Sequence, residues 1–205
     1  RDRVMDSPVS ENAVTGIALG ASLTKSRPIV IHPRMDFMIL ALDQIVNQAA
    51  KWRSMMGGNA YSNLTIRSII NRGGEQGAQH SQSLHSWLAH IPGIVVAMPY
   101  SVQDAHDLLI SSVRSNNPVI FIDDRWLYNL ESNFKERRKI KNIFDYRPKK
   151  ILNGMDITIV GCGFGTKVGY DVSKYLKSYK ISSDLYDLRV LNPLRISVLK
   201  KSVKK

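Results

Sequence analysis

The sequence contains a single cysteine, Cys162, among 205 residues, so an internal disulfide framework is excluded and a reducing compartment is indicated. A small core residue and a reactive thiol are both open interpretations of Cys162. No run of about 18 apolar residues is present, which argues against a membrane-spanning helix. No secretory signal is recognisable either, and the first residue is arginine, as is typical of an internal piece of a longer protein.

Acidic residues are scarce, with 17 Asp and Glu against 29 Lys and Arg, which gives a formal net charge of +12. The excess is concentrated in two stretches. Residues 125–150 hold nine basic and three acidic residues, and residues 200–205 hold four lysines. A basic linker and a basic tail are typical of solvated surface. Because zinc-finger spacing, an RNA-binding aromatic signature and a convincing helix-turn-helix are lacking, we do not expect nucleic-acid binding as the main function.

Apolar residues, at 43% of the chain, are numerous enough for a substantial core, and their spacing alternates between strand and helix periods. Alternation of this kind predicts an α/β fold with three layers, in which a mostly parallel sheet is covered on both faces. The predicted strands are 28–32, 64–70, 94–98, 119–122, 156–160 and 183–189. The predicted helices begin at Glu11 (capped by Ser10), cover 38–55, 80–89, 102–114 and 167–179, and begin again at Asn192-Pro193.

Three regions follow from this pattern. Residues 1–128 form the first α/β domain, whose N-terminal part is expected to be missing, and residues 129–153 form a basic inter-domain linker. Residues 154–205 form a second α/β unit, which is expected to be incomplete because a three-layer domain needs more than two strands to bury its helices.

A glycine cluster, Gly161-Cys-Gly-Phe-Gly165, lies between a predicted strand and a predicted helix. Such a position suggests a dinucleotide-binding fingerprint, but that fingerprint needs a glycine where Thr166 stands. We favour a tight strand-to-helix turn that needs a positive φ. A Walker phosphate loop is absent from the sequence.

Several segments, in order, resemble the beta subunits of the thiamine-diphosphate-dependent 2-oxo acid dehydrogenases of the pyruvate, branched-chain and acetoin types. These are Asp6-Ser-Pro-Val-Ser-Glu11, Ala41–Lys51 with Gly57-Gly58, Gly77-Ala-Gln-His-Ser-Gln-Ser83, Asn116–Phe121, Gly154–Gly161 and Tyr186–Asn192 with Pro193. The resemblance covers nearly the whole chain. It implies a transketolase-like pyrimidine-binding domain followed by the beginning of the C-terminal domain.

The resemblance also implies the residues that act. Glu11 matches the glutamate that hydrogen-bonds a ring nitrogen of the aminopyrimidine and favours its imino tautomer. His80 matches the histidine that handles protons or positions the acyl group near the reacting carbon. Phe37 matches the aromatic residue that packs against the pyrimidine ring. His85 and His90, further along, fit structural roles.

A potassium ion is a further implication, since some members hold one at the positions matched here. These positions are Leu64, Ser112, Val113, Ser115 and Asn117. Most of the ligands in the family are backbone carbonyls, which the sequence constrains poorly. One family position carries an aspartate where Ser115 stands, and loss of that charge should weaken cation binding.

Partners follow from the same resemblance. The pyrophosphate and its magnesium are held by a separate alpha subunit through a Gly-Asp-Gly motif, which this sequence lacks. We therefore expect an alpha partner, a second copy of this chain in an α2β2 assembly, a lipoyl acyltransferase as acceptor and a small 2-oxo acid as substrate, without a membrane. The expected location is the cytoplasm, or the mitochondrial matrix in a eukaryote.

Two departures from the family pattern border the expected substrate pocket, at residues 31–36 and 68–76. The added His32 and Arg34 lead to the hypothesis that the substrate is larger, polar or anionic.

Two alternatives remain open at this point. One is ketol transfer by a split enzyme resembling transketolase or deoxyxylulose-phosphate synthase, which have the same pyrimidine domain. The other is a non-catalytic scaffold or a basic nucleic-acid-binding fragment, against which the presence of both Glu11 and His80 argues.

Overall fold

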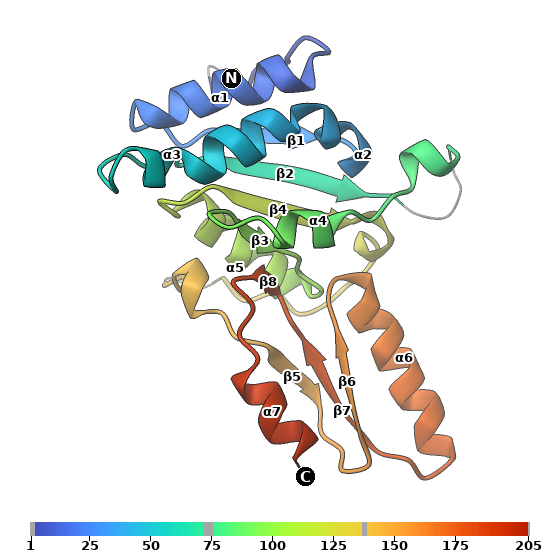
Figure 1. The fold of residues 1–205 in the computed structure, drawn as a ribbon. Coiled ribbons are helices and arrows are strands. Elements are labelled where there is room, and N and C mark those ends of the chain that lie inside the picture. Colours follow the sequence, from blue (N-terminus) through green and yellow to red (C-terminus); the bar gives the residue numbers. More distant parts are fainter. Residues whose placement is uncertain (1–2, 72–75, 137–138, 205) are drawn as a thin grey trace.

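The computed structural model describes residues 3–71, 76–136 and 139–204, and they fold into two units (Figure 1). A five-stranded sheet forms the first unit and a three-stranded sheet forms the second. The segment that differs from the family pattern at 68–76 is therefore described only in part, because residues 72–75 lie outside these ranges. Residues 137–138 of the basic linker and Lys205 of the tail lie outside them as well.

The first sheet is mostly parallel, as predicted. Its strand order is β1-β2-β4-β3-β8, and only the β3–β8 pair is antiparallel. The strands are β1 Ile29–His32, β2 Thr65–Ile70, β3 Val95–Ala97, β4 Val119–Asp124 and β8 Val190–Asn192. The four parallel strands agree with the predicted ranges to within two residues at each end.

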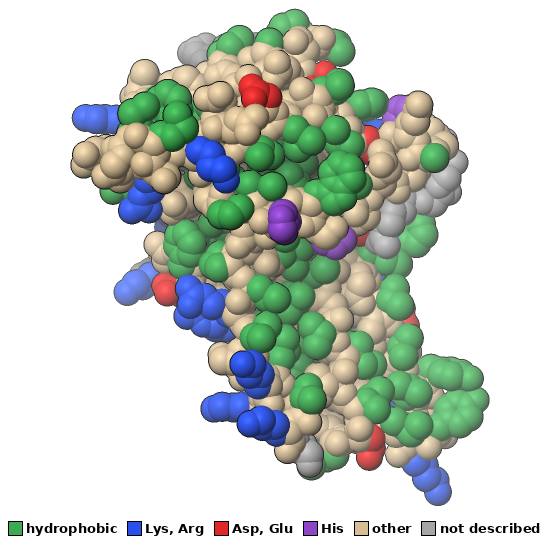
Figure 2. All heavy atoms as spheres, in the orientation of Figure 1, with side chains coloured by type: hydrophobic (Ala, Val, Ile, Leu, Met, Phe, Trp, Pro, Cys, Tyr) green, Lys and Arg blue, Asp and Glu red, His purple; other side chains and the backbone are tan. Residues whose placement is uncertain are grey.

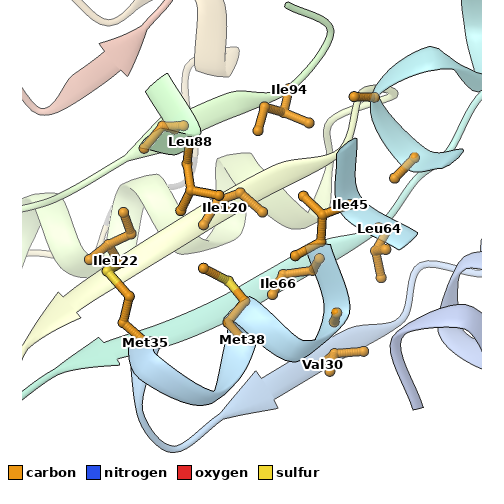
Figure 3. Packing of buried hydrophobic residues seen from close by; sticks show 14 of the residues in the cluster. Val30, Met35, Met38, Ile45, Leu64, Ile66, Leu88, Ile94, Ile120 and Ile122 are labelled. Carbon is orange, nitrogen blue, oxygen red and sulfur yellow. The ribbon is translucent and has the colours of Figure 1, made fainter. Parts of the chain in front are cut away.

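Helices cover both faces of this sheet and complete the three predicted layers. Alternate residues of β4 show this, because Ile120 belongs to one buried cluster while Phe121 belongs to the other. The first cluster lies under the helices α1 to α4, and Figure 3 shows Met35, Met38 and Ile45 packed onto strand residues there. The covering helical elements are α1 Glu11–Leu23, α2 Met35–Met38, η1 Ile39–Ala41, η2 Asp43–Ala49, α3 Ala50–Met55 and α4 His85–Ala89 on that face, with α5 Val102–Val113 and η5 Ile143–Asp145 on the other.

Three local predictions need correction. Helix α1 begins at Glu11 as expected, but the Ser10 side chain makes no capping hydrogen bond. The helical stretch predicted from residue 38 begins at Met35, and residues 43–49 within it are π-helical. The helix predicted for 80–89 is interrupted, because the 3-10 turn η3 Ala78–His80 is separated from α4 by an irregular segment.

The second unit is a small sheet with order β5-β7-β6. Its elements are β5 Lys149–Leu152, β6 Ile157–Gly161, α6 Phe164–Ser178, β7 Ser183–Asp187 and α7 Ser197–Val203. The predicted linker differs from the structure at its end, because β5 pairs with β7 as a strand of this sheet. The glycine cluster makes the strand-to-helix turn: Gly163 has φ +50°, and a Cβ there would lie 2.5 Å from Cε of Met98.

The chain returns to the first sheet after β7, where we predicted that a helix would begin at Asn192-Pro193. Instead, β8 pairs with β3, and the Asn192 side chain donates hydrogen bonds to the carbonyls of Ile91 and Ile94 at 3.0 and 2.9 Å. Because β8 belongs to the first sheet while β7 and α7 belong to the second unit, the chain crosses between the two units on either side of β8.

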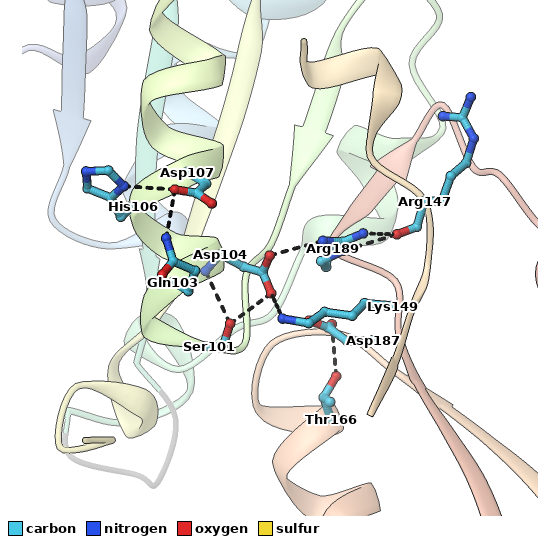
Figure 4. Close-up of polar contacts among 10 residues, drawn as sticks. All are labelled: Ser101, Gln103, Asp104, His106, Asp107, Arg147, Lys149, Thr166, Asp187 and Arg189. Atoms are coloured by element: carbon cyan, nitrogen blue, oxygen red, sulfur yellow. Dashed lines mark hydrogen bonds and ion pairs between the residues drawn. The ribbon is translucent and has the colours of Figure 1, made fainter. Parts of the chain in front are cut away.

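A polar cluster reinforces this junction (Figure 4). The carboxylate of Asp104, at the start of α5, accepts hydrogen bonds from Arg189 at 3.0 Å and from Lys149 at 3.0 Å. Burial raises the pKa of Asp104, but the charge of Arg189 and the bond from Lys149 outweigh it, so that the pKa is lowered. Asp104 therefore ties the first unit to two segments of the second as a charged carboxylate.

The surface shows no single basic patch in the view of Figure 2, where the described Lys and Arg side chains lie in separate groups along both units. Apolar side chains gather over α6, where an exposed stripe follows helical spacing. The stripe consists of Val168, Val172, Tyr175 and Tyr179. Within the described ranges, no helix combines the length and the apolar character that crossing a bilayer requires.

Asp187, at the end of β7, has one oxygen bonded by Thr166 at 3.1 Å and a second, buried oxygen without a partner among the described residues. Burial raises the pKa of Asp187 to about 7, and the nearby Asp104 carboxylate adds to this. The protonated form is favoured in the folded chain, so its stabilising contribution is complete below the ordinary pKa and is lost as pH rises through about 7.

We therefore expect wild-type protein to lose stability relative to Asp187→Asn between pH 4.5 and pH 8. At about 1.4 kcal/mol per pKa unit, the relative loss is on the order of 3 kcal/mol. Urea unfolding at both pH values measures it, with Asp145→Asn, an exposed aspartate, as the control. Equal pH dependence in wild type and Asp187→Asn would contradict this assignment.

Candidate functional site

The candidate site lies where the parallel strands β1 and β2 end. His32 is the last residue of β1 and is paired in register with Ser68 of β2, so both strands point toward the same edge of the sheet. Ligands of open α/β sheets commonly bind at this carboxyl edge. The segment after β1 carries Phe37, and the loop after β2 carries His80.

Glu11 reaches this edge from α1. The helix packs beside β1, and its first turn places the half-buried Glu11 close enough to His32 for their charges to interact. Glu11 makes no hydrogen bond or ion pair with any residue in the described part of the chain. A carboxylate in the first turn of a helix is favoured by the helix dipole, so Glu11 is a charged acceptor that is available to a ligand.

His32 is a neighbour of Glu11 that the sequence did not identify as such. Its ring is buried, and its Nε2 lies 3.1 Å from Oγ1 of Thr15, one helical turn after Glu11. Burial lowers the pKa of His32, against the opposing effect of the Glu11 carboxylate. A neutral ring that already bonds Thr15 does not suit the hypothesis that His32 binds an anionic substrate.

Phe37 and His80 are in direct contact. Their ring centroids are 5.2 Å apart with an interplanar angle of 87°, which is an edge-to-face pair. Both side chains are half-buried, and Nδ1 of His80 is buried without a hydrogen-bond partner among the described residues. The structure therefore brings together two of the predicted residues and places Glu11 at the same edge of the sheet.

Arg34 also has a partner at this edge. Its Nη1 donates a hydrogen bond to the backbone carbonyl of His80 at 3.2 Å. The hypothesis that Arg34 binds an anionic substrate is therefore weakened, because the guanidinium already holds the loop that carries His80.

The predicted potassium positions lie at the opposite, amino end of the strands. Arg27 approaches them: its Nη1 donates to the carbonyls of Val113 and Ser115 at 2.9 and 2.7 Å, and its Nη2 donates to Oδ1 of Asn116 at 2.8 Å. The Leu64 carbonyl accepts the sheet bond of Val119, and the Ser112 carbonyl accepts from the Ser115 amide. Asn117 Oδ1 accepts from Arg53 at 3.3 Å.

A potassium ion fits these residues poorly, because a guanidinium already supplies positive charge to two of the carbonyls that would bind it. We infer that the Arg27 guanidinium takes the place of a potassium ion at the loop of residues 112–117, as a built-in cation.

Two of the cavities in the described chain have volumes of about 450 and 220 Å³. The larger is lined by Arg53, Gly57 and Asn117 at the amino ends of the strands, and the smaller by Tyr100, Asp123 and Tyr128. Glu11, Phe37 and His80 line neither of these two cavities.

Arg27→Met is expected to lower the free energy of unfolding by about 1–2 kcal/mol, because carbonyls that accepted charged hydrogen bonds lose their donor at a partly exposed site. The wild-type melting temperature should be unchanged when KCl replaces choline chloride at equal ionic strength. Arg27→Lys keeps the positive charge but loses the two guanidinium nitrogens that donate to three acceptors. Arg114→Met, at an exposed arginine, is the control. A saturable rise of several degrees with potassium in wild type would refute the built-in cation.

Comparison with known proteins gives concordant results. The family model described as "Transketolase, pyrimidine binding domain" matches residues 1–131. The acetoin:2,6-dichlorophenolindophenol oxidoreductase subunit beta of Cupriavidus necator is 37% identical over 98% of this chain and 59% of its own length. The pyruvate dehydrogenase E1 component subunit beta of Rickettsia bellii is 35% identical over 99% of this chain and 62% of its own length. The mitochondrial subunit of the same name from Saccharomyces cerevisiae is also 35% identical.

Solved structures show the same fold. A split-gene transketolase, in an inactive beta4 tetramer, superposes with a TM-score of 0.78 at 20% identity, covering 99% of this chain and 62% of that one. A transketolase from Pichia stipitis gives 0.72 at 17% identity, covering 94% of this chain and 28% of that one. The chain thus spans less than two thirds of the length of each of these proteins.

Proposed function

Because the chain belongs to the transketolase pyrimidine-binding domain family, we propose that it is the beta-type subunit of a thiamine-diphosphate-dependent 2-oxo acid dehydrogenase. The observation that carries the proposal is the half-buried Glu11, which has no hydrogen-bond or ion-pair partner among the described residues, at the same sheet edge as Phe37 and His80. The curated relatives at 35–37% identity, which are named as beta subunits of pyruvate dehydrogenase and of an acetoin oxidoreductase, support the reaction class.

The residues present fit the aminopyrimidine of thiamine diphosphate. The Glu11 carboxylate is an acceptor without a partner in the described chain, and a ring N–H of the aminopyrimidine would satisfy it. The half-buried Phe37 offers an aromatic surface against which a heterocycle can pack. When bound, thiamine diphosphate supplies the carbon nucleophile and the electron sink for cleavage of the bond next to a carbonyl group.

Glu11 holds the proton that decides which pyrimidine nitrogen is basic. Its position favours this task, since it lies in the first turn of α1, where the helix dipole favours a carboxylate, and close to the buried His32. His80 acts beside the reacting group, where its unpartnered Nδ1 is suited to hold or move a proton. These side chains bind, orient and transfer protons while the cofactor supplies the bond-breaking chemistry.

Partners complete the proposed enzyme. Glu11, Phe37 and His80 are only half-buried in the described chain, and a second polypeptide that covers them would make the dry site that such chemistry needs. We assign this cover, together with the magnesium and pyrophosphate, to an alpha subunit in an α2β2 assembly. The acyl group passes to the lipoyl group of an acyltransferase, and the location is cytoplasmic in a bacterium or the mitochondrial matrix in a eukaryote.

Glu11→Gln, in an assembly with the alpha subunit, is expected to slow hydrogen–deuterium exchange at the reactive thiazolium carbon of thiamine diphosphate about 100-fold or more. The amide keeps the shape but cannot hold the proton. NMR after acid quench measures the exchange, and calorimetry measures cofactor affinity, which should change only a few-fold. The control is Asp6→Asn, an exposed acid in the same N-terminal region. Equal exchange in wild type and Glu11→Gln would remove Glu11 from the mechanism.

His80→Ala should give the opposite pattern. Proton exchange at the cofactor is expected to stay within about 3-fold of wild type, while reduction of 2,6-dichlorophenolindophenol by a 2-oxo acid falls about 100-fold, because His80 serves the later proton transfers. His90→Ala, at an exposed histidine beyond the site, is the control. Full dye reduction by His80→Ala would exclude this role.

A further inference from the structure

Four consecutive residues, from Arg34 to Phe37, each contact the loop that carries His80. Arg34 donates to the His80 carbonyl at 3.2 Å, and Phe37 packs against the His80 ring with centroids 5.2 Å apart. Between them, Sδ of Met35 accepts the amide hydrogen of Leu84 at 3.0 Å. The contacts join the beginning of one helix to an irregular segment 43 to 49 residues further along the chain.

Asp36 is at the centre of this set. Its Oδ1 accepts two hydrogen bonds from Gln82, one from the backbone amide at 3.1 Å and one from side-chain Nε2 at 2.9 Å. The residue is only 7% exposed, and Oδ2 is buried without a partner in the described part of the chain. One carboxylate oxygen therefore holds the loop from both the main chain and a side chain.

Stability alone does not account for a carboxylate at this position. A buried charged oxygen without a partner costs free energy, whereas a leucine of similar size would avoid that cost beside the apolar Met35 and Met38. The carboxylate instead accepts two hydrogen bonds from a loop that has little regular structure of its own. The hydrogen bonds to the loop therefore indicate that Asp36 positions the loop, whereas a leucine would only fill the space.

The His80 ring depends on such ordering. Its buried Nδ1 has no hydrogen-bond partner among the described residues, so that nitrogen does not orient the ring. The ring direction is instead determined by the backbone at residue 80 and by the Phe37 contact, and both are controlled by the segment 34–37.

We propose that Asp36 is the positioning residue of the His80 loop: by holding Gln82 it sets the His80 ring against Phe37, next to the bound pyrimidine. This inference rests on the proposed function, because it needs His80 to act on the reacting group. Asp36 itself touches neither cofactor nor substrate. Its effect is therefore confined to steps that need His80 and leaves the Glu11 step unchanged.

Two substitutions of similar size test this role. Asp36→Asn keeps an oxygen that can accept both bonds from Gln82, whereas Asp36→Leu removes it. Asp43→Leu is the matched control, since Asp43 is an exposed acid on the same helical stretch and accepts hydrogen bonds from Gln44 and Asn47. Gln82→Leu changes the donor residue instead. It removes the hydrogen bond from Nε2 of Gln82 to Asp36 and leaves the one from the Gln82 backbone amide.

The first measurement needs no catalysis. Amide hydrogen exchange at Gln82, followed by NMR in the isolated chain, should be at least 10-fold faster in Asp36→Leu than in wild type, with Asp36→Asn and Asp43→Leu close to wild type. The melting temperature of Asp36→Leu should stay within a few degrees of wild type, because the loss of two hydrogen bonds is offset by removal of a buried oxygen that has no partner in the described chain. Unchanged amide exchange at Gln82 in Asp36→Leu would overturn the proposal. A large loss of stability in both Asp36→Leu and Gln82→Leu would also overturn it, because the contact between these residues would then serve stability rather than positioning.

The second measurement uses the assembly with the alpha subunit. Asp36→Leu should lower turnover of a 2-oxo acid at least 10-fold, leave proton exchange at the thiazolium carbon within about 2-fold, and be rescued by Asp36→Asn. Equal loss in both steps overturns the proposal, because Asp36 would then support the whole pocket. If wild-type assemblies show no proton exchange at all, the proposed function fails, while amide exchange at Gln82 still decides whether Asp36 holds the loop.

Discussion

The parallel pairing of β1 with β2 is the constraint on which the candidate site depends. The pairs from Ile29 with Thr65 to His32 with Ser68 run in one register, so both strands end at one edge of the sheet. The segment of chain that follows each strand must then begin at that edge of the sheet. The segment 34–37 follows β1 and the loop around His80 follows β2, while α1, which packs antiparallel beside β1, brings Glu11 to the same place. Residues separated by up to 69 positions are thus collected without any direct sequence signal between them.

Three carboxylates in the chain show how environment assigns different tasks to one functional group. Glu11 is half-buried and unpaired in the described chain, which leaves it available to a ligand. Asp36 is buried and accepts only the neutral donors of Gln82, which suits the ordering of a loop. Asp104 is buried against Arg189 and Lys149, and its lowered pKa keeps it charged at the junction of the two units. The first two serve the proposed site, and the third holds β8 and β5 in place around the first sheet.

The partial burial of the site residues has a physical consequence for the proposed enzyme. Proton transfer between a carboxylate and a heterocycle is favoured where water is excluded, and Glu11, Phe37 and His80 are only half-buried in the described chain. In the proposed enzyme this chain would supply one wall of the site and another polypeptide the other wall. The match to a pyrimidine-binding domain over residues 1–131 agrees with such a division, since the pyrimidine is one half of the cofactor.

The sequence by itself determined the class of fold, the order of strands and helices, and the family, because apolar periodicity and short motifs are local properties. It also led to Glu11, Phe37 and His80 through motif resemblance, although their roles stay predictions. Only the tertiary structure decided that β5 and β8 are strands, since their pairing partners lie far away and their own patterns are weak. It alone placed Thr15 and His32 beside Glu11, and Arg27 at the predicted potassium carbonyls. The contacts of Asp36 with Gln82 were likewise beyond the sequence, because a charged residue within an apolar helix predicts burial with a partner but does not say which partner the fold will bring.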